Sequence, residues 1–277
     1  MNIAIVHNAY GKLSGEETVI ENLAALLVER DVSVCRFSRS SAEIEDKLSG
    51  KMAAFFSGIH NLFAAKAFAE FLKSNRPDVV HIHNLYPLIS PSILPVCTKL
   101  GIPVVMTVHN FRLACPNGLL LSHGEICHRC LGGREYWCVL RNCESSIFKS
   151  TGYALRTAAA RMLRRYYDNV DHFICLSEFQ KNILVGEGLP AERVSVLANP
   201  VSFDMKIPPT PLYKRGEIAS AVKMDTPAFA GLRRQVHEGM TKGYVAYVGR
   251  ISQEKDIFTL LEAARRLGDI PFKFAGD

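Results

Sequence analysis

Apolar and polar residues alternate along the first 200 positions in two patterns, one typical of buried strands and one of amphipathic helices. Short apolar runs typical of strands occur at residues 2–7, 32–37, 77–83, 104–108, 171–176 and 194–197. The first stretch between them carries apolar residues at helical spacing, namely Val19, Ile20, Leu23, Leu26 and Leu27. Strands that alternate with helices predict an α/β fold, with a parallel sheet covered on both faces.

The helical pattern also covers residues 60–73 and 90–100, and a long helix is expected before the strand at residue 171. Ser177 follows that strand and is a good N-cap for the next helix. Ligands of such sheets bind at the carboxyl ends of the strands, so the residues that follow each strand are the first candidates for a site.

Beyond residue 200 the pattern changes. Prolines interrupt residues 201–243, which predicts a linker, and residues 244–277 supply only a strand, a helix and a strand. A βαβ unit of this size buries too little apolar surface to be stable alone. We therefore expect a Rossmann-like domain at residues 1–200, with a Cys-rich insertion at 111–145, followed by the start of a second, C-terminally truncated domain.

The composition is that of a globular protein, with 277 residues, 48% of them hydrophobic and 22% charged. Apolar stretches are shorter than the roughly 20 residues that cross a bilayer, and the N-terminus reads as a strand, not a signal peptide. Eight cysteines without an export signal favour a reducing compartment. The sequence therefore predicts a cytoplasmic protein.

The net charge of +6 is concentrated in one stretch, residues 149–166, where basic and apolar residues share a helical pattern. Such a helix can lie on an anionic membrane at the inner face, or it can be a solvated face of the domain. No nucleic-acid-binding motif accompanies the charge, so nucleic acid is not an expected partner.

The segment after the strand at residues 245–248 carries two cations. Gly249 lets the backbone turn closely, and Arg250 and Lys255 stand beside the start of the next predicted helix. A helix N-terminus favours an anion, so this segment predicts a diphosphate site. The alternative is an ordinary exposed loop whose Arg and Lys are solvated.

The run from Gly249 to Asp256, with the helix after it, resembles the donor-binding segment of glycosyltransferase family 4 enzymes. The resemblance implies a GT-B fold, in which two Rossmann-like domains flank a cleft. It also implies that Arg250 and Lys255 contact the diphosphate of a nucleotide diphosphate sugar. Asp256 stands where the family usually has Gly.

Elements of the first domain resemble the same family. Thr107-Val108-His109-Asn110 is similar to its Thr-x-His-Asp segment, which implies that His109 is the catalytic candidate near the transferred sugar. His81 and His83 lie on the same face of one predicted strand, and we expect His83 to line the cleft and His81 to be structural. The cleft and acceptor residues implied by the resemblance are Gly15, His83, Asn84, Ser177, Glu178 and Asn199.

Five cysteines lie between residues 115 and 143. Cys127 and Cys130 form a C-x2-C pair, and with Cys115 and Cys143 they could hold a structural zinc ion in a tetrahedral site. An iron–sulfur cluster is less favoured, and reduced thiols without a metal are the alternative.

The resemblance implies a retaining glycosyltransferase that moves a hexose from a nucleotide diphosphate sugar to a glycan or lipid-linked acceptor and requires no cofactor for catalysis. The family's Glu-x7-Glu segment is missing before Asp277. Two alternatives stay open: a truncated, inactive form that acts in binding only, and a metal-binding scaffold organised by the cysteines.

Overall fold

A computed structural model describes residues 1–10, 15–43 and 57–200, and, further along, residues 245–248, 262, 265–266 and 272–275. The chain divides into two compact units, Met1–Phe203 and Asp204–Asp277. The predicted linker at 201–243 lies outside the described residues. So do Gly249, Arg250 and Lys255, and the diphosphate site predicted there stays a prediction.

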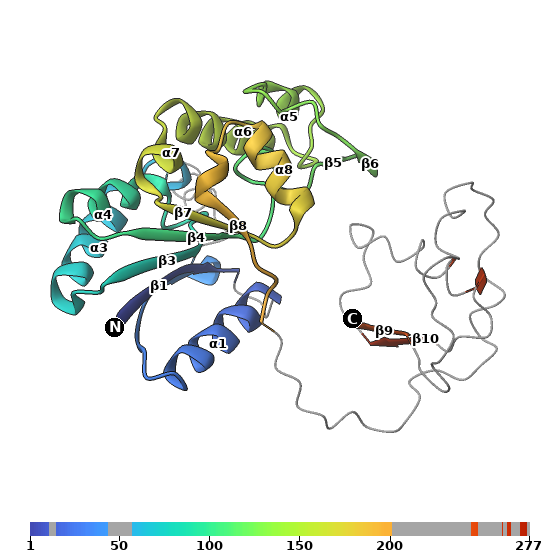
Figure 1. Ribbon diagram of the computed structural model, residues 1–277. Helices are drawn as coiled ribbons and strands as arrows, with labels where there is room; N and C mark the ends of the chain where they lie inside the picture. Colours follow the sequence, from blue (N-terminus) through green and yellow to red (C-terminus); the bar gives the residue numbers. More distant parts are fainter. Residues whose placement is uncertain are drawn as a thin grey trace. The chain divides into compact units, whose positions relative to one another are not determined.

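The first unit is built on a six-stranded sheet in the order β2-β1-β3-β4-β7-β8, in which every pair is parallel (Figure 1). Its strands are β1 (Asn2–Ala9), β2 (Ser33–Ser40), β3 (Val79–Asn84), β4 (Val104–Val108), β7 (His172–Cys175) and β8 (Val194–Val196). The predicted α/β fold with a Rossmann-like parallel sheet is confirmed. The chain leaves β1 toward β2 and then continues from β3 in the other direction, which makes a topological switch point between β1 and β3.

Helices cover the sheet as the apolar periodicity predicts. They are α1 (Gly15–Val28), α3 (Leu62–Asn75), α4 (Leu94–Leu100), α6 (Ile147–Met162), α7 (Arg165–Asn169) and α8 (Glu178–Gly186). Short 3-10 helices join them at η1 (Ser41–Glu43), η2 (Pro91–Ile93) and η3 (Ala191–Arg193). As expected, the Ser177 side chain caps α8 by accepting a hydrogen bond of 3.2 Å from the Gln180 amide.

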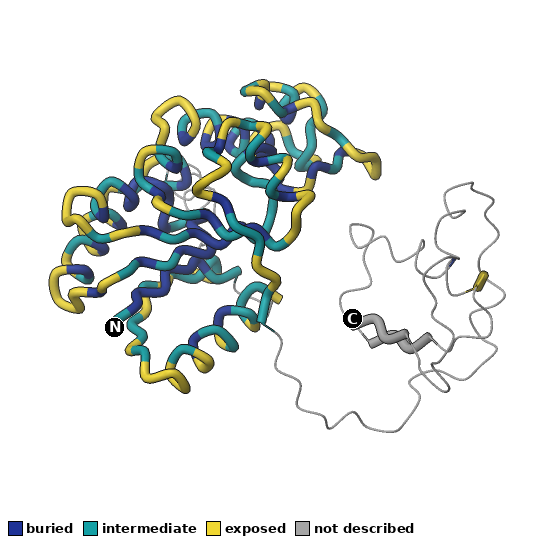
Figure 2. Tube along the Cα trace, in the orientation of Figure 1, coloured by how far each residue is buried: buried dark blue, intermediate teal, exposed yellow. Residues whose placement is uncertain are grey.

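The two faces of β1 belong to different apolar clusters. Ala4 and Val6 join the main core, which contains Phe68 and Leu72 of α3, whereas Ile3 and Ile5 pack with α1. Figure 2 shows the buried residues concentrated along the central strands. Because side chains alternate along a strand, every second residue of β1 faces α1.

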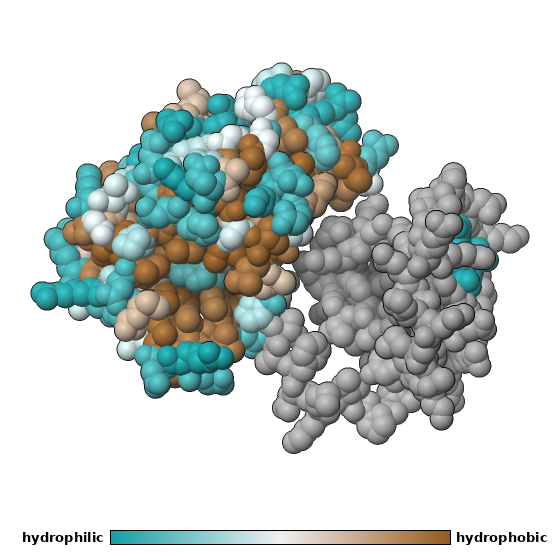
Figure 3. All heavy atoms as spheres, viewed as in Figure 1, coloured by the Kyte–Doolittle hydropathy of each residue, from teal (hydrophilic) through white to brown (hydrophobic). Residues whose placement is uncertain are grey.

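Helix α1 packs through few residues. Ile20 and Ala24 are its buried residues, and Leu26 and Val28 are exposed. In Figure 3 hydrophobic residues accordingly gather at the surface around this helix.

The Cys-rich insertion is more regular than the sequence indicates. It forms a short hairpin from β5 (Leu121–Ser122) and β6 (Glu125–Ile126), followed by helix α5 (Tyr136–Leu140). The long helix predicted over residues 149–166 is interrupted, because Arg164 adopts a left-handed conformation (φ 48°) between α6 and α7.

In the second unit, β9 (Val245–Val248) and β10 (Phe272–Ala275) pair in parallel, as expected for strands joined by a helix. The Glu262 carboxylate accepts hydrogen bonds from Arg265 (2.9 Å) and Arg266 (2.7 Å). In the described part of the chain no helix is long and apolar enough to cross a membrane.

We expect Phe68→Ala to destabilise the first unit strongly. Phe68 is fully buried against Phe37 and Phe71, at ring distances of 5.0 and 6.1 Å, so truncation leaves a cavity that costs about 3–5 kcal/mol. Phe63 lies on the same helix but is 89% exposed, so Phe63→Ala is the matched control and should cost under about 0.5 kcal/mol. Denaturant unfolding measures both, and equal effects would contradict this packing of α3.

Candidate active site at the carboxyl ends of β1, β3 and β4

Three neighbouring strands end in histidines at the switch point. The register pairs Ile5 with His81 and His81 with Val105, so these residues project from the same face of the sheet. The register shifts between Val6 and His7, so that His7 pairs with Asn84. The ring contacts of His83 with His81 (4.4 Å) and with His109 (5.1 Å) place these histidines together near the carboxyl ends of β3 and β4. This is the face that α1 covers, and the first turn of α1 therefore adjoins the histidines.

His83, which we expected to line the cleft, and His109, the catalytic candidate, contact each other directly. His83 Nδ1 lies 2.8 Å from His109 Nε2, and their rings stack at 5.1 Å. One ring donates and the other accepts, because two neutral imidazoles share one proton in such a contact. His81 Nε2 lies 2.8 Å from Thr107 Oγ1 and so ties β3 to β4, in keeping with the structural role expected for it.

His7 meets the start of α1. Its Nδ1 lies 3.5 Å from Glu16 Oε1, and both side chains are buried. Glu16 Oε2 accepts a hydrogen bond of 3.0 Å from the Tyr10 hydroxyl, and Glu17 accepts one of 3.0 Å from the Tyr10 amide. The first turn of α1 therefore presents carboxyl groups to the site.

Burial keeps the histidines neutral. Desolvation lowers the pKa of His7, His81 and His109 to about 4, and a nearby Glu17 offsets this only in part at His7. Burial also lowers the pKa of His83, and the neighbouring histidines add to the effect. At neutral pH each ring can therefore both donate and accept one hydrogen bond.

Burial shifts the pKa of the Glu16 carboxyl group upward, opposite to its effect on the histidines. Burial raises the pKa of Glu16 to about 7, although the Tyr10 hydroxyl and Arg112 favour its charged form. The pKa of Tyr10 rises to about 12, again mainly through burial. Glu16 is thus divided between its two protonation states near neutral pH, where a carboxyl can accept or donate a proton.

Several buried polar atoms of this site have no hydrogen-bond partner among the described residues. They are His7 Nδ1, His7 Nε2, Glu16 Oε1, His83 Nε2 and Arg112 Nε. Buried polar groups are nearly always paired in proteins, and of these atoms His7 Nδ1 and Glu16 Oε1 face each other at 3.5 Å. The described residues therefore leave buried polar atoms of His7, His83 and Arg112 without a hydrogen-bond partner beside the histidines.

The sequence prediction did not include Tyr10, Glu16 or Arg112. Arg112 stands three residues after His109 and places its guanidinium 5.8 Å from the centre of the Tyr10 ring. Gly118 (φ +79°) leaves room for the Arg112 side chain, because a Cβ at residue 118 would lie only 2.7 Å from Arg112 Cγ. Their positions in the sequence could have indicated two of them: Tyr10 directly follows β1, and Arg112 lies in the same loop as His109.

The other predicted site residues of the first unit lie at the starts or ends of strands and helices. The Asn84 side chain donates to the backbone oxygens of Asn8 (2.9 Å) and Tyr86 (3.3 Å), so it braces β3 against β1. Gly15 begins α1 with open space around its Cβ position. Ser177 and Glu178 are exposed at the start of α8, and Asn199 is half-buried after β8.

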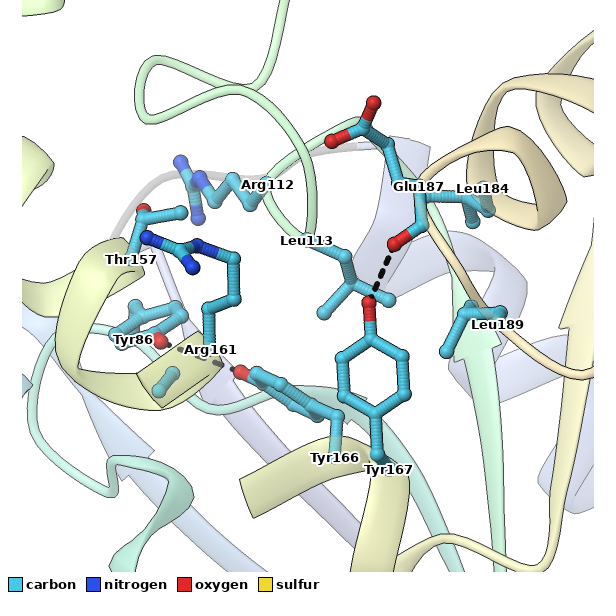
Figure 4. A pocket seen from close by; sticks show the side chains of 11 residues that line it. Tyr86, Arg112, Leu113, Thr157, Arg161, Tyr166, Tyr167, Leu184, Glu187 and Leu189 are labelled. Carbon is cyan, nitrogen blue, oxygen red and sulfur yellow. Dashed lines mark hydrogen bonds between the residues drawn. The ribbon is translucent and has the colours of Figure 1, made fainter. Parts of the chain in front are cut away.

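A small cavity lies beside Arg112 and is shown in Figure 4. Its wall is fixed by two hydrogen bonds, from Tyr166 to the Tyr86 hydroxyl (3.2 Å) and from Tyr167 to the Glu187 carbonyl (2.7 Å). Its volume of about 20 Å³ admits roughly one water molecule, so this cavity is too small for a sugar.

The predicted basic face at residues 149–166 is only partly exposed. Arg156 is buried, with its guanidinium 3.7 Å from the Tyr153 ring centre and 4.4 Å from that of Tyr86. Arg161 pairs with Glu135 at 2.7 Å, and Arg164 pairs with Asp168 at 3.0 Å. The prediction treated Arg156 as a surface cation, and this was wrong because its side chain packs between aromatic rings.

The described residues of the first unit form a Rossmann-like α/β domain with a group of buried polar side chains at its switch point. The profile of Glycosyltransferase Family 4 matches residues 13–204, more than half of the chain. The chain therefore belongs to glycosyltransferase family 4. No curated protein matches the chain.

Three solved structures illustrate what the chain is similar to. The lipopolysaccharide outer core galactosyltransferase WaaB is 16% identical over 100% of this chain and 69% of its own (TM-score 0.41). MurG of Acinetobacter baumannii is 11% identical over 99% and 57% (TM-score 0.42). UDP-GlcNAc 2-epimerase from Neisseria meningitidis, bound to UDP-GlcNAc, is 13% identical over 72% and 47% (TM-score 0.38). The chain thus spans about half of the epimerase, and likenesses this distant assign it no substrate.

We expect Glu16→Gln to change how stability depends on pH. Between pH 4.5 and about 7 the folded protein keeps a proton on Glu16 that the unfolded chain has lost. The wild type therefore loses stability relative to the variant as pH rises through this window, by roughly 3 kcal/mol at most. The histidines are the same in both proteins and cancel in the difference. Urea unfolding at a series of pH values measures it.

Glu21→Gln, on the same helix, is the control. Arg36 donates a hydrogen bond of 2.9 Å to Glu21 and lowers its pKa, so this carboxylate stabilises the fold above its ordinary pKa. Its loss should therefore change the pH dependence with the opposite sign and only at more acidic pH. A flat difference between wild type and Glu16→Gln would contradict the burial of Glu16.

Proposed function

We propose that this chain binds a sugar at the histidine site and acts in a retaining glycosyltransferase. That enzyme moves a hexose from a nucleotide diphosphate sugar to a glycan or lipid-linked acceptor. The observation that supports the proposal is that His7 Nε2 and His83 Nε2 are buried without a hydrogen-bond partner among the described residues, in a chain of this family. Neutral hydroxyl groups of a sugar can pair with these nitrogens.

The chemistry of the site suits sugar hydroxyls. A hydroxyl donates one hydrogen bond and accepts others, and a neutral imidazole offers one donor and one acceptor. His7 Nε2 has no hydrogen-bond partner among the described residues, and a pKa of about 4 keeps the ring neutral at neutral pH. Glu16, with a pKa of about 7, can pair with either side of a hydroxyl.

His109 is the proposed catalytic residue of the first unit. It is held by His83 at 2.8 Å, which fixes its ring and so restricts the orientation of a bound sugar or acceptor. Arg112 lies in the same loop and supplies a fixed positive charge beside the site. It would stabilise an anionic group of the donor or the acceptor.

The reaction follows from the donor chemistry that the family resemblance implies. The bond between the anomeric carbon and the diphosphate oxygen breaks, and a bond to the acceptor oxygen forms on the same face of the sugar. The acceptor's proton passes to the leaving diphosphate, so atoms and charge balance. Arg250 and Lys255 would neutralise the leaving group.

Membrane contact through residues 149–166 belongs to the same proposal and suits a lipid-linked acceptor. Arg156, Arg161 and Arg164 already have partners, so the attraction would depend on exposed Lys149 and on the apolar side chain of Met162, which is 74% exposed. The site would then act at the inner face of the membrane.

We expect His109→Gln to lower sugar transfer at least tenfold and to leave nucleotide binding unchanged. The amide keeps one hydrogen bond to His83 but loses the shape and tautomers of the ring. His172→Gln is the matched control: His172 lies on β7, where Nε2 contacts Ser195 Oγ at 2.9 Å, outside the site. Product formation from a panel of nucleotide diphosphate sugars measures transfer, and the anomeric configuration of the product tests retention.

Binding is measured separately by calorimetry with nucleoside diphosphates. Arg250→Ala and Lys255→Ala should each weaken binding about tenfold or more, because each removes a charge from a diphosphate. Binding without turnover would favour the binding-only alternative. No binding of any nucleoside diphosphate, or binding that survives both substitutions, would contradict the proposed donor.

A further inference from the structure

Two groups of ligand-type side chains lie outside the histidine group. The first is the set of cysteines in the insertion, of which Cys130 and Cys138 are buried in one apolar cluster. No three His, Cys, Asp or Glu side chains of the described residues are grouped as metal ligands, so the zinc site expected at Cys115, Cys127, Cys130 and Cys143 stays a prediction. The second group consists of two arginines, one in the loop after β4 and one on α6.

Arg156 of α6 is a buried cation. It is 6% exposed, and its guanidinium lies 3.7 Å from the centre of the Tyr153 ring and 4.4 Å from that of Tyr86. Its Nη2 donates to the Pro116 carbonyl at 3.2 Å, but its buried Nε has no hydrogen-bond partner among the described residues. Aromatic rings and one carbonyl oxygen offset only part of the cost of burying a full charge, so this arginine favours an anion beside it.

Arg112 contacts the same turn of the chain as Arg156. A Cβ at Gly118 would lie 3.4 Å from Arg112 Nε, and Pro116, the partner of Arg156, is two residues earlier. The buried Nε of Arg112 also lacks a hydrogen-bond partner among the described residues. Burial lowers the pKa of Arg156, and the charge of Arg112 lowers it further, because like charges disfavour each other.

The cavity shown in Figure 4 adjoins both arginines. Arg112 lines it together with Tyr86 and Thr157. The Tyr86 ring contacts Arg156, which precedes Thr157 on α6. Tyr86 accepts the hydroxyl proton of Tyr166, so its own O–H remains to donate to an acceptor. The cavity therefore presents hydrogen-bond donors, and its volume of about 20 Å³ has room for about one oxygen atom of a larger anion.

The carboxyl groups nearby do not balance these charges. Neither arginine has a carboxylate oxygen within 4 Å among the described residues. Burial raises the pKa of Glu144 although both arginines favour its charged form, and it raises the pKa of Glu16 to about 7. Glu187 lines the cavity, but its Oε2 accepts from the Gly132 amide at 2.8 Å. The described residues thus leave the two guanidinium groups without a matching anion.

We infer that Arg112 and Arg156 form a binding site for a phosphoryl group, with one phosphoryl oxygen directed into the cavity at Thr157. Guanidinium groups pair with oxyanions through N–H donors in a fixed fork, and the unpaired Nε atoms supply such donors. A terminal phosphoryl group offers three oxygens, enough for two guanidinium groups and one hydroxyl. A carboxylate offers two and leaves one of these partners unpaired.

The proposed function makes this phosphoryl group part of the acceptor, and this step rests on that function. Arg112 follows His109 by three residues, so the phosphoryl group would be held by the loop that carries the catalytic candidate. The donor diphosphate is expected at Arg250 and Lys255 in the second unit, which leaves the site in the first unit to the acceptor. The acceptor is then a phosphorylated molecule, either a lipid phosphate or a sugar phosphate.

Calorimetry of the full chain with inorganic phosphate at constant ionic strength tests the site without sugar transfer. Every protein compared carries Arg250→Ala and Lys255→Ala, so that the predicted donor site does not contribute. In this background Arg112→Gln should weaken phosphate binding at least tenfold, because it removes one of the two cations. Arg164→Gln is the matched control and should leave binding unchanged, because Arg164 is 64% exposed and pairs with Asp168.

Proton–nitrogen spectra of the wild type give the same answer without a substitution. The Nε–H signals of Arg112 and Arg156 should shift when inorganic phosphate is added, and acetate at the same concentration should shift them far less. Absence of phosphate binding, an equal loss in Arg112→Gln and Arg164→Gln, or equal shifts with acetate would overturn the inference. His109→Gln should bind phosphate as the wild type does, so failure of the proposed transfer and failure of this site are separate results.

Two phosphate esters distinguish the sources of the phosphoryl group. Tighter binding of geranyl phosphate than of inorganic phosphate would identify a lipid phosphate as the acceptor, and tighter binding of glucose 6-phosphate would identify a sugar phosphate. In either case Arg112→Gln should weaken the ester by the same factor as inorganic phosphate. If both esters bind more weakly than inorganic phosphate, the assignment of the site to an acceptor is overturned.

Discussion

The parallel alignment of β1, β3 and β4 is the constraint on which the site depends. Because β1 pairs with β3 and β3 with β4, the carboxyl ends of the three strands lie at one edge of the sheet, and a register shift after Val6 pairs His7 with Asn84, next to His83. His7, His83 and His109 are therefore neighbours although about 100 residues separate the first from the last. Without this register, each would be an isolated strand-end histidine.

Burial then determines what these residues can do. A desolvated imidazole is neutral, and a desolvated carboxyl tends to keep its proton, so the site carries little charge of its own near neutral pH. His7 and His109, with pKa values of about 4, and Glu16, with a pKa of about 7, differ in the direction of the shift but share its cause. The result is a group of neutral donors and acceptors with Arg112 as the cation beside them.

Much of the first unit could be predicted from its apolar periodicity. Apolar residues recur at regular spacings in most strands and helices, and alternation along β3 correctly placed His81 and His83 on one face. Contacts between segments could not be predicted in this way. Arg156 is buried partly against Tyr86, which lies seventy residues earlier in the chain. The local sequence pattern predicts the helix that carries Arg156, but it cannot predict this distant contact. Helix α5 is too short to show a period, which is why Cys138 was overlooked as a neighbour of Cys130.

The central claim is that the histidines at the switch point form a neutral, hydrogen-bonded group. Proton–nitrogen correlation spectra of the imidazole rings, recorded on the folded chain as a function of pH, test it most directly. We predict that His7, His81, His83 and His109 keep the nitrogen shifts of neutral rings from pH 7 down to about pH 5, and that His83 and His109 show complementary tautomers. Titration of His83 and His109 near the ordinary histidine pKa of about 6.5 would contradict the account.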